Sequence, residues 1–272
     1  MSKHIAIITV AYNNYTVLNE FVERLRNQSD LEFHLYIVDA SDEKKTINIS
    51  GISNTILPIT NKGYAHGVNA GLKMAVDDSL QYFCIINDDV EFDHNFVKKL
   101  KIAFSNNPNA IFGGKIFYAP GFEYHKNRYP KEELGKVIWY GGGTVDWKHA
   151  TTHHVDVDEV DDGLPENALK TDFITGCLMC FDNSVLEKVG FWDEKYFLYY
   201  EDADFCERAK KHNVKLIYDP NIIIWHKNAQ STGGSGSTLH QKFQRQARLR
   251  FAIKFAPLRT KLHVLKNYIF NS

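Results

Sequence analysis

The chain has 272 residues, of which 44% are hydrophobic and 24% are charged, so it is long enough for one large core with an added lobe. Its 32 basic and 33 acidic residues give a formal net charge of -1, which excludes the broad basic field of a nucleic-acid-binding protein. The four cysteines lie in apolar segments, the chain opens on a strand-like run, and no apolar run reaches the roughly 18 residues that cross a bilayer. We therefore expect a cytoplasmic protein for which any membrane contact is peripheral, at the inner face.

Strand-like runs and helical patterns alternate through the first part of the chain. The strand-like runs span residues 5–10, 33–38, 56–59 and 82–86. Apolar side chains recur at helical spacing at 17, 21 and 25, across 68–76, and at 96, 100 and 104. This alternation predicts an α/β fold with a mostly parallel sheet that helices cover on both faces. Ligands of such sheets bind beyond the carboxyl ends of the strands.

The second part of the chain is less regular. Residues 118–170 are polar, with three glycines at 141–143 and an acidic run at 156–162, and they predict an excursion or hairpin and not a domain. The pattern then predicts a strand at 173–181, helices around 185–189 and 202–211, and strands near 216 and at 222–225. Residues 231–238 predict a flexible linker. After Asp219 the chain has nine Lys or Arg residues and no Asp or Glu.

Asn87, Asp88 and Asp89 follow the fourth strand-like run and form an acidic group at its end. Such oxygen ligands suit Mg²⁺ or Mn²⁺, and an ion held by one or two carboxylates can bridge a diphosphate. The alternative is a helix start, because Asp93 precedes a helical pattern and first turns favour acidic residues. His226 ends an apolar strand and is either a neutral metal ligand or a core histidine.

Two further segments suit a nucleotide. Asp39 ends the second strand-like run, where an acidic residue can accept hydrogen bonds from a nucleobase or ribose. Residues 61–67 precede a helix, so their glycines would let the backbone approach an anionic ligand, with a plain turn as the alternative. Neither a G-x-G-x-x-G after the first strand nor a P-loop motif occurs, which argues against dinucleotide or P-loop chemistry.

Residues 191–204 combine tyrosine, tryptophan and phenylalanine with five acidic residues. Aromatic faces stack on sugar rings, and carboxylates accept hydrogen bonds from sugar hydroxyls. A carboxylate in such a partly desolvated environment becomes more basic, which suits it to deprotonate an attacking hydroxyl. The alternative is an acidic helix start beside core aromatics.

Three other features have competing interpretations. Cys177 and Cys180 have the spacing of a redox or zinc site, but their apolar surroundings favour buried thiols. Residues 149–158 contain three histidines and two aspartates, for which a solvated loop is favoured over a metal site. The basic tail either contacts an anionic membrane or a lipid diphosphate acceptor, or forms a helix that packs on the body.

Six motifs, taken in order, resemble glycosyltransferase family 2. They are TVAYNN at 9–14, VD at 38–39, N-x-GY-x-x-G-x-N-x-G at 61–71, NDDV at 87–90, Gly176, and YED-x-D at 200–204. The likeness covers roughly residues 4–230 and lies within the bacterial rhamnosyltransferase and galactofuranosyltransferase branch. It implies a GT-A fold and an inverting transfer from a UDP- or dTDP-sugar. The acceptor would be a hydroxyl of a glycan or lipid-diphosphate-linked glycan in bacterial surface polysaccharide synthesis, and the cofactor Mn²⁺ or Mg²⁺.

The resemblance also implies an organisation and a set of residue roles. Residues 1–230 would form the catalytic domain, with 1–117 binding the nucleotide sugar and 118–230 the acceptor, followed by a linker and basic helices over 231–272. Asp202 would be the general base with Glu201 beside it, while Asp89 and His226 would hold the metal. Asp39 would bind the nucleobase. The other nucleotide-sugar positions would be Thr9, Ala11, Tyr12, Asn13, Asn61, Gly63, Gly67, Asn69, Asn87 and Asp88, and the acceptor side would include Gly176, Trp192, Asp193 and Tyr200.

The chain departs from the family pattern at Asn87, where an aspartate is common, so Asp88 or a water would supply the missing oxygen. Two other functions stay open: a sugar nucleotidyltransferase, and a non-catalytic glycan-binding module on a glycosyltransferase scaffold. The first lacks a glycine-rich basic first loop here. The presence of Asp89, Glu201, Asp202 and His226 together argues against the second.

Overall fold

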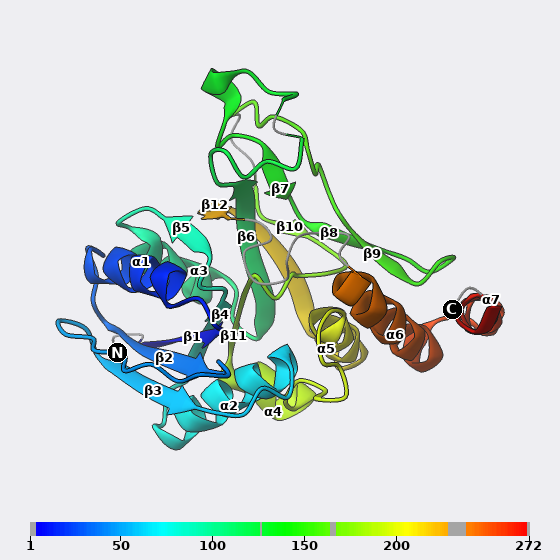
Figure 1. Ribbon diagram of the computed structural model, residues 1–272, viewed down its shortest axis with the longest axis horizontal. Helices are drawn as coiled ribbons and strands as arrows, with labels where there is room; N and C mark the ends of the chain where they lie inside the picture. The colour runs from blue at the N-terminus through cyan, green and yellow to red at the C-terminus, as the bar shows by residue number, and fades with distance from the viewer. Residues whose placement is uncertain (1–3, 126, 164–166, 228–237, 271–272) are drawn as a thin grey trace.

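The computed structural model describes residues 4–125, 127–163, 167–227 and 238–270 (Figure 1). Its centre is a ten-stranded sheet in which eight strands lie in the order β10-β12-β6-β11-β4-β1-β2-β3, with β5 beside β12 and β7 beside β6. These strands are β1 (Ile5–Ala11), β2 (Phe33–Asp39), β3 (Asn54–Pro58), β4 (Tyr82–Ile86), β5 (Val90–Phe92), β6 (Ala110–Tyr118), β7 (Ile138–Tyr140), β10 (Leu169–Lys170), β11 (Leu178–Asp182) and β12 (Lys215–His226).

The sheet is mixed, but its main strands are parallel. β1 pairs in parallel with both β2 and β4, β2 with β3, and β6 with β12. β11 runs antiparallel to β4 and β6 and separates the two parallel groups. The predicted mostly parallel sheet is therefore confirmed, with one reversed strand near its centre.

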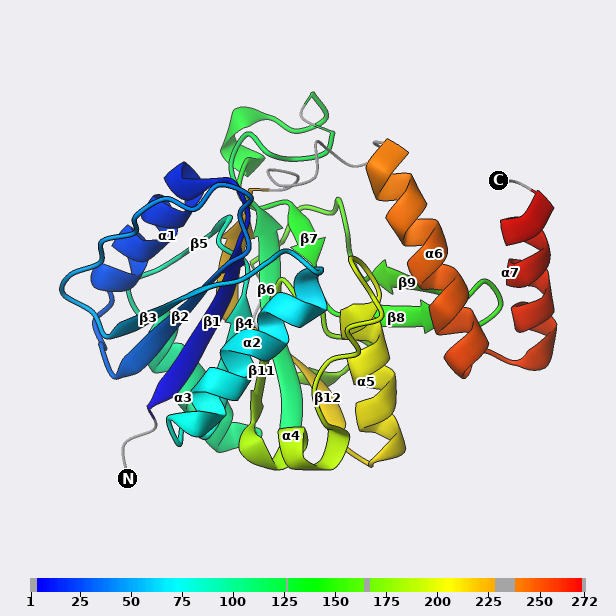
Figure 2. The same cartoon turned by 60° about the horizontal axis from the view of Figure 1, so that its bottom comes forward.

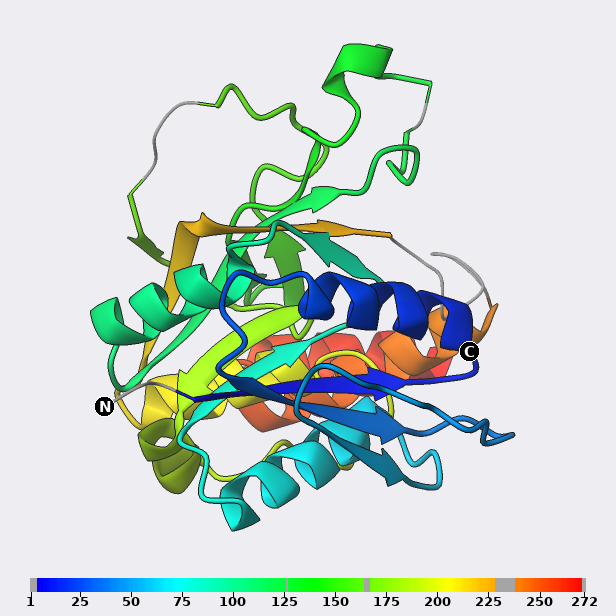
Figure 3. The same cartoon turned by 90° about the vertical axis from the view of Figure 1, so that its left-hand side faces the viewer.

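Helices cover both faces of the sheet, as the alternating pattern predicted. They are α1 (Tyr15–Arg26), α2 (Tyr64–Asp77), α3 (Phe96–Asn106), α4 (Asn183–Val189) and α5 (Glu201–Lys211). Figure 3 shows α1 and α3 on one face and α2 on the other. The buried face of α1 consists of Leu18, Phe21, Val22 and Leu25, and the side chain of Asn14 caps its first turn by accepting a hydrogen bond from the Val17 amide.

Two glycines let α2 pack closely on β1. A methyl group at Gly67 would lie 2.7 Å from the Val10 side chain, and one at Gly71 would lie 2.5 Å from Ile8. Both distances are too short for a real side chain. The α2 backbone is therefore held against the strand that leads to the site.

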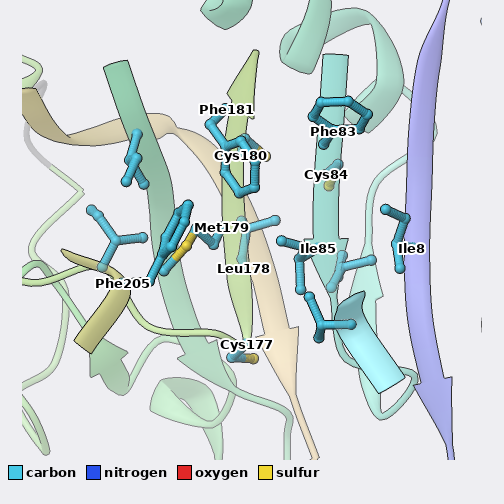
Figure 4. Close-up of a cluster of buried hydrophobic side chains, with 14 of the residues drawn as sticks. Ile8, Phe83, Cys84, Ile85, Cys177, Leu178, Met179, Cys180, Phe181 and Phe205 are labelled. Atoms are coloured by element: carbon cyan, nitrogen blue, oxygen red, sulfur yellow. The ribbon is translucent and has the colours of Figure 1, made fainter. Parts of the chain in front are cut away.

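The core lies where β4 and β11 meet (Figure 4). Cys84 and Cys180 face each other in register on these strands, and all four cysteines are buried free thiols. This agrees with the interpretation of Cys177 and Cys180 as buried thiols. The predicted strand at 173–181 was wrong in extent, because β11 begins only at Leu178 and the preceding residues form a turn.

The C-terminal half departs from the simple pattern in two ways. The strands predicted near 216 and at 222–225 are one strand, β12, with an irregularity between Asp219 and Ile223 where its pairing with β6 shifts. The segment between β6 and β10 is an excursion, as predicted. It carries the short helix η1 (Lys131–Glu133) and a hairpin of β8 (Gly143–Asp146) and β9 (Thr151–His154).

The C-terminal segment forms two helices, α6 (Thr238–Phe255) and α7 (Leu258–Phe270), which confirms the predicted helical extension. Figure 2 shows α5, α6 and α7 side by side in that order. On α6, Phe251 stacks on Trp147 and packs against Tyr200, so α6 is a helix that packs on the body. Of the predicted linker, residues 231–237 lie outside the described residues. In the described part of the chain, no helix has the length and apolar character needed to span a bilayer.

Candidate active site

The candidate site lies at the carboxyl ends of β1, β2 and β4, where the parallel strands place loops at one edge of the sheet (Figure 2). Thr9 is buried in β1, and its hydroxyl has no hydrogen-bond partner among the described residues. The Ala11 carbonyl accepts a hydrogen bond from the Ala40 amide. Tyr12 and Asn13 both donate to Asp42, which joins the loops after β1 and β2.

Asp39 is buried at the end of β2 and accepts two hydrogen bonds. Its Oδ1 accepts from the Ser41 amide at 3.0 Å, and its Oδ2 accepts from the Tyr15 hydroxyl at 2.8 Å. A carboxylate has further lone pairs, so these contacts orient the group and leave room for a base or ribose donor.

The segment from Asn61 to Asn69 has a clear packing role. The Asn61 side chain accepts from the Gly63 amide, and a methyl group at Gly63, whose φ is 105°, would lie 2.4 Å from the Phe197 carbonyl oxygen. The buried Asn69 amide donates to the Trp192 carbonyl and accepts from the Trp192 amide. These contacts bind the first half of α2 to the loop between α4 and α5, while the predicted contact with a donor stays a prediction.

Asp89, in the loop between β4 and β5, lies beside His226 at the end of β12, and their geometry suits a shared cation. Asp89 Oδ1 lies 3.2 Å from His226 Nε2, and both side chains are buried. Two ligands about 2.1 Å from one ion at right angles would lie about 3.0 Å apart, which is close to this separation. Among the described residues, Asp89 Oδ1 and His226 Nδ1 have no hydrogen-bond partner. The pair fits a divalent ion that takes its remaining ligands from phosphate and water.

Among the described residues, no group of three or more His, Cys, Asp or Glu side chains is placed to hold a metal ion. An ion at Asp89 would therefore have few protein ligands, as Mg²⁺ does in many diphosphate sites. Asp88 is also buried, and burial, together with the neighbouring Asp89, raises its pKa to about 8.

Asp202 stands at the start of α5 with its carboxylate fixed by the backbone. Its Oδ2 accepts from the Gly176 amide at 2.8 Å, and its Oδ1 accepts from the Ala203 amide at 2.8 Å. Burial raises the pKa of Asp202 to about 6, although these backbone hydrogen bonds lower it. The group is therefore an oriented carboxylate that is more basic than an ordinary aspartate and still ionised at neutral pH.

Glu201 precedes Asp202 and is buried. Burial and then the charge of Asp202 raise the pKa of Glu201 well above its usual range. Tyr199 and Tyr200 turn the chain into α5 through left-handed backbone conformations, with φ of 72° and 65°. The Tyr200 ring packs on Phe251 of α6.

Tyr64 links the acidic loop to the carboxylate at the start of α5, a role that sequence reasoning missed. Its hydroxyl lies 3.0 Å from Asn87 Oδ1 and 3.1 Å from the Gly176 carbonyl oxygen, where it can donate to either. Gly176 in turn holds Asp202, and the Asn87 amide donates to the Cys177 carbonyl. The hydroxyl of Tyr64 was visible in the N-x-GY motif, but its partners come from two distant segments.

Trp192 and Asp193 lie in the loop between α4 and α5, where Lys254 of α6 holds Asp193. The Trp192 ring stacks on Phe205 and meets Tyr64 edge-on. Lys254 of α6 lies 3.1 Å from Asp193 Oδ2 and also pairs with the buried Asp204. The sequence reasoning missed Lys254, which stood only as one cation of the basic tail.

The three histidines of residues 149–158 each contact a different partner and do not form a shared cluster. His149 pairs with Asp146, His153 contacts Thr151, and His154 is held by the Trp139 carbonyl. Burial lowers the pKa of His154 to about 4. These contacts are local. The expected solvated loop is found only in part, because Thr151–His154 forms the strand β9 and His154 is half-buried.

Comparison with known proteins identifies the family. The sequence model of glycosyl transferase family 2 matches residues 6–190, so the chain belongs to that family. A low-salt glycan biosynthesis hexosyltransferase, Agl10 of Haloferax volcanii, is 24% identical over 57% of this chain and 46% of its own length. The dTDP-rhamnosyl transferase RfbF of Shigella flexneri is 22% identical over 93% of this chain and 79% of its own.

A third relative, the N-acetylglucosaminyl-diphospho-decaprenol L-rhamnosyltransferase of Mycobacterium tuberculosis, is 34% identical over 22% of this chain and 20% of its own length. The chain thus spans less than half the length of Agl10 and about a fifth of the mycobacterial enzyme. Two of these three relatives are rhamnosyltransferases, in line with the predicted branch.

Solved structures of glycosyltransferases share the fold. GalNAc-T7, solved with UDP, GalNAc and Mn²⁺, superposes with a TM-score of 0.67 at 13% identity, covering 92% of this chain and 47% of that one. The mannosyltransferase PcManGT of Pyrobaculum calidifontis was solved with GDP-Man and Mn²⁺. It superposes with a TM-score of 0.52 at 13% identity, covering 98% of this chain and 70% of that one. The predicted GT-A fold is confirmed.

Proposed function

We propose that this chain is an inverting glycosyltransferase that moves a sugar from a nucleoside diphosphate donor to a hydroxyl of a glycan acceptor. The observation that carries the proposal is the connection between Asp89 and Asp202. Asp89 shares its loop with Asn87, and the Tyr64 hydroxyl bridges Asn87 to Gly176, whose amide holds Asp202. A site for the departing diphosphate therefore adjoins an oriented base.

Asp202 takes the proton of the acceptor hydroxyl as that oxygen bonds to the anomeric carbon, and the bond from that carbon to the diphosphate oxygen breaks. The raised pKa of Asp202 supports this role, because a base near pKa 6 is ionised at neutral pH yet accepts a proton more readily than an ordinary aspartate. A single displacement inverts the anomeric configuration, and it needs no second carboxylate as nucleophile. The roles of Glu201, Trp192, Asp193, Gly176 and Tyr200 on the acceptor side belong to this proposal.

Asp89 and His226 would hold a divalent ion, Mn²⁺ or Mg²⁺, which when bound would offset the charge that grows on the departing diphosphate. The buried, hydrogen-bond-free Asp89 Oδ1 beside His226 Nε2 supports this assignment. The Mn²⁺ in the structures of GalNAc-T7 and PcManGT supports a metal-dependent fold. Asp39, held by Ser41 and Tyr15, would bind the nucleobase.

For the donor we propose a UDP- or dTDP-sugar, on the strength of the dTDP-rhamnosyl transferase relative and the UDP-bound neighbour. For the acceptor we propose a glycan or lipid-diphosphate-linked glycan of a bacterial cell surface, because the mycobacterial relative acts on a diphospho-decaprenol sugar. Residues 1–117 would bind the donor and 118–230 the acceptor. Such an acceptor favours contact with the inner face of the membrane.

The test is donor hydrolysis with Mn²⁺ or Mg²⁺ and a panel of UDP- and dTDP-sugars, monitoring the released nucleoside diphosphate. Asp202→Asn should keep nucleotide binding but lower transfer to an acceptor by about 10²–10⁴-fold, because the base is removed. Asp77→Asn, at an exposed carboxylate on α2, is the matched control and should be unaffected. Substantial transfer by Asp202→Asn would refute the base assignment. If the wild type hydrolysed none of the donors and bound no nucleotide, a non-catalytic glycan-binding module would be favoured instead.

A further inference from the structure

The outer face of α7 carries a stripe of exposed leucines. Leu258 is 72% exposed, Leu262 60% and Leu265 39%, and their spacing of four and three residues places them on one side of the helix. Ile269, which is 57% exposed, continues the spacing one turn further on. Burying these side chains in an apolar medium would be strongly favourable.

The opposite face of α7 docks on the protein, so the orientation of the stripe is fixed. Thr260 and Val264 are buried, and the Thr260 hydroxyl donates to the Trp147 carbonyl at 2.8 Å. Arg245 of α6 donates to the Tyr268 carbonyl and lies over the Tyr268 ring. The leucine stripe therefore points away from the protein body. The helix itself lies at one outer edge of the molecule (Figures 1 and 2).

Cations flank this stripe, and the C-terminal segment has no acidic residue to balance them. Arg259 and Lys266 are exposed and Lys261 is half-buried, and the chain has no Asp or Glu after Asp219. If a second copy packed along the same stripe, these cations would face one another on both sides of the seam, which opposes self-association. The same arrangement suits an anionic lipid surface, which takes up apolar side chains and attracts the surrounding lysines and arginines.

We propose that α7 lies in the interface of an anionic membrane, with Leu258, Leu262 and Leu265 inserted and Arg259, Lys261 and Lys266 among the headgroups. This deepens the proposed function and rests on it for the identity of the acceptor. α6 lies between α7 and α5, the helix that carries Asp202. Two helix-to-helix distances of ~8–10 Å each therefore separate α5 from α7, which would lie at the membrane face. A lipid-linked acceptor held in that membrane could thus present its glycan to the site.

The test is sedimentation of the full-length protein with vesicles of phosphatidylcholine, alone or mixed with an equal amount of phosphatidylglycerol. We expect binding only to the mixed vesicles, with loss at high salt. Replacing Leu258, Leu262 and Leu265 by Ser should weaken binding at least about a hundredfold. Replacing Arg259, Lys261 and Lys266 by Gln should weaken it on the order of a hundredfold. All six positions lie outside the proposed site.

A matched control is the pair Ile102→Ser and Lys98→Gln, which removes an exposed apolar side chain and an exposed cation from α3. This control should bind vesicles like the wild type. Equal vesicle binding by the leucine variant and the wild type would overturn the proposal. A second outcome would also overturn it: the wild type binds no vesicles and is a dimer in sedimentation velocity, while the leucine variant is a monomer. Donor hydrolysis without vesicles tests the activity separately: vesicle binding with no hydrolysis would overturn the proposed function alone.

Discussion

Replacing Tyr64 by Phe tests whether the link between the acidic loop and the base matters for turnover. The change removes only the hydroxyl, which lies 3.0 Å from Asn87 Oδ1 and 3.1 Å from the Gly176 carbonyl, and it keeps the ring against Trp192. Loss of a buried donor leaves its acceptors unsatisfied, which costs about 1–3 kcal/mol. Because 1 kcal/mol shifts the Tm of a chain of this size by roughly 2–4 °C, the loss should be measurable by thermal unfolding.

The larger effect should be on catalysis. Strand pairing and the hydrogen bond from the Asn87 amide to the Cys177 carbonyl still hold the two segments together, but the Asn87 side chain and the Gly176 carbonyl lose the hydroxyl that joins them. A displacement of about 1 Å between reacting groups can cost about a hundredfold in rate. We expect kcat for transfer to fall about tenfold to a hundredfold with little change in the KM for the donor.

Tyr36→Phe is the matched control for this experiment. Tyr36 is a buried tyrosine of β2, and its hydroxyl donates to Asp78 Oδ2 at 2.7 Å. Asp78 follows the C-terminal end of α2, whereas Tyr64 and the candidate site lie at the N-terminal end of this helix. Tyr36→Phe should lower the free energy of unfolding but leave kcat unchanged. If Tyr64→Phe lost stability yet retained the wild-type kcat, the bridge would have no role in positioning the base.

Four further results follow from the same geometry. Because the pKa of Asp202 is raised to about 6, transfer should be constant well above that pH and fall about tenfold per unit below it, and a pH profile of kcat/KM without such a fall would contradict the assignment. Because burial and the charge of Asp202 raise the pKa of Glu201, the neutral side chain in Glu201→Gln should preserve stability better than Glu201→Ala, which leaves a cavity, and an equal loss of Tm in both variants would contradict this. Gly63→Ala should lower the free energy of unfolding by at least about 1–3 kcal/mol, because its φ of 105° and its contact with Phe197 exclude a methyl group, and unchanged chemical denaturation would argue against that contact. Finally, Mn²⁺ should raise the Tm of the wild type but not of His226→Ala, and equal stabilisation of both would remove His226 from the metal site.

The parts of the fold that the sequence predicted best are those governed by local patterning. The predicted fourth strand at 82–86 matches the bounds of β4, and the first two strands and the helices after them differ only at their ends. Here the apolar spacing reports directly which face of an element is buried. The family and its GT-A fold could be predicted because the motifs appear in order along the chain.

The errors arose where contacts between distant residues decide the structure. Residues 173–177 are apolar enough for a strand, but the Asn87 amide donates to the Cys177 carbonyl and Asp202 accepts from the Gly176 amide, so Gly176 and Cys177 form a turn just before β11. The two predicted strands near the end of the catalytic region merge because Asp219–Ile223 is an irregularity within one strand. Periodicity alone does not report such long-range contacts.

The same limit applies to the site. The positions of Asp89, His226 and Asp202 followed from the motifs, and the structure brings the first two within 3.2 Å of each other. The Tyr64 bridge and the ion pair of Lys254 with Asp193 join segments far apart in sequence, and only the folded chain places them together. Donor binding by Asn69 stays a prediction, and its side-chain amide group also bonds to the backbone of Trp192, a contact that no local pattern indicates.

The reversed strand β11 has a consequence for how such a protein can change over evolutionary time. Because β11 runs against β4, it begins at the edge of the sheet where β4 ends, and this brings Gly176 beside Asn87 across a long stretch of intervening sequence. The pairing of β11 with β4 sets that meeting, whatever the length of the excursion between β6 and β11. Insertions or deletions in residues 119–170 can therefore remodel the surface beside the candidate site without altering the distance between Asn87 and Asp202.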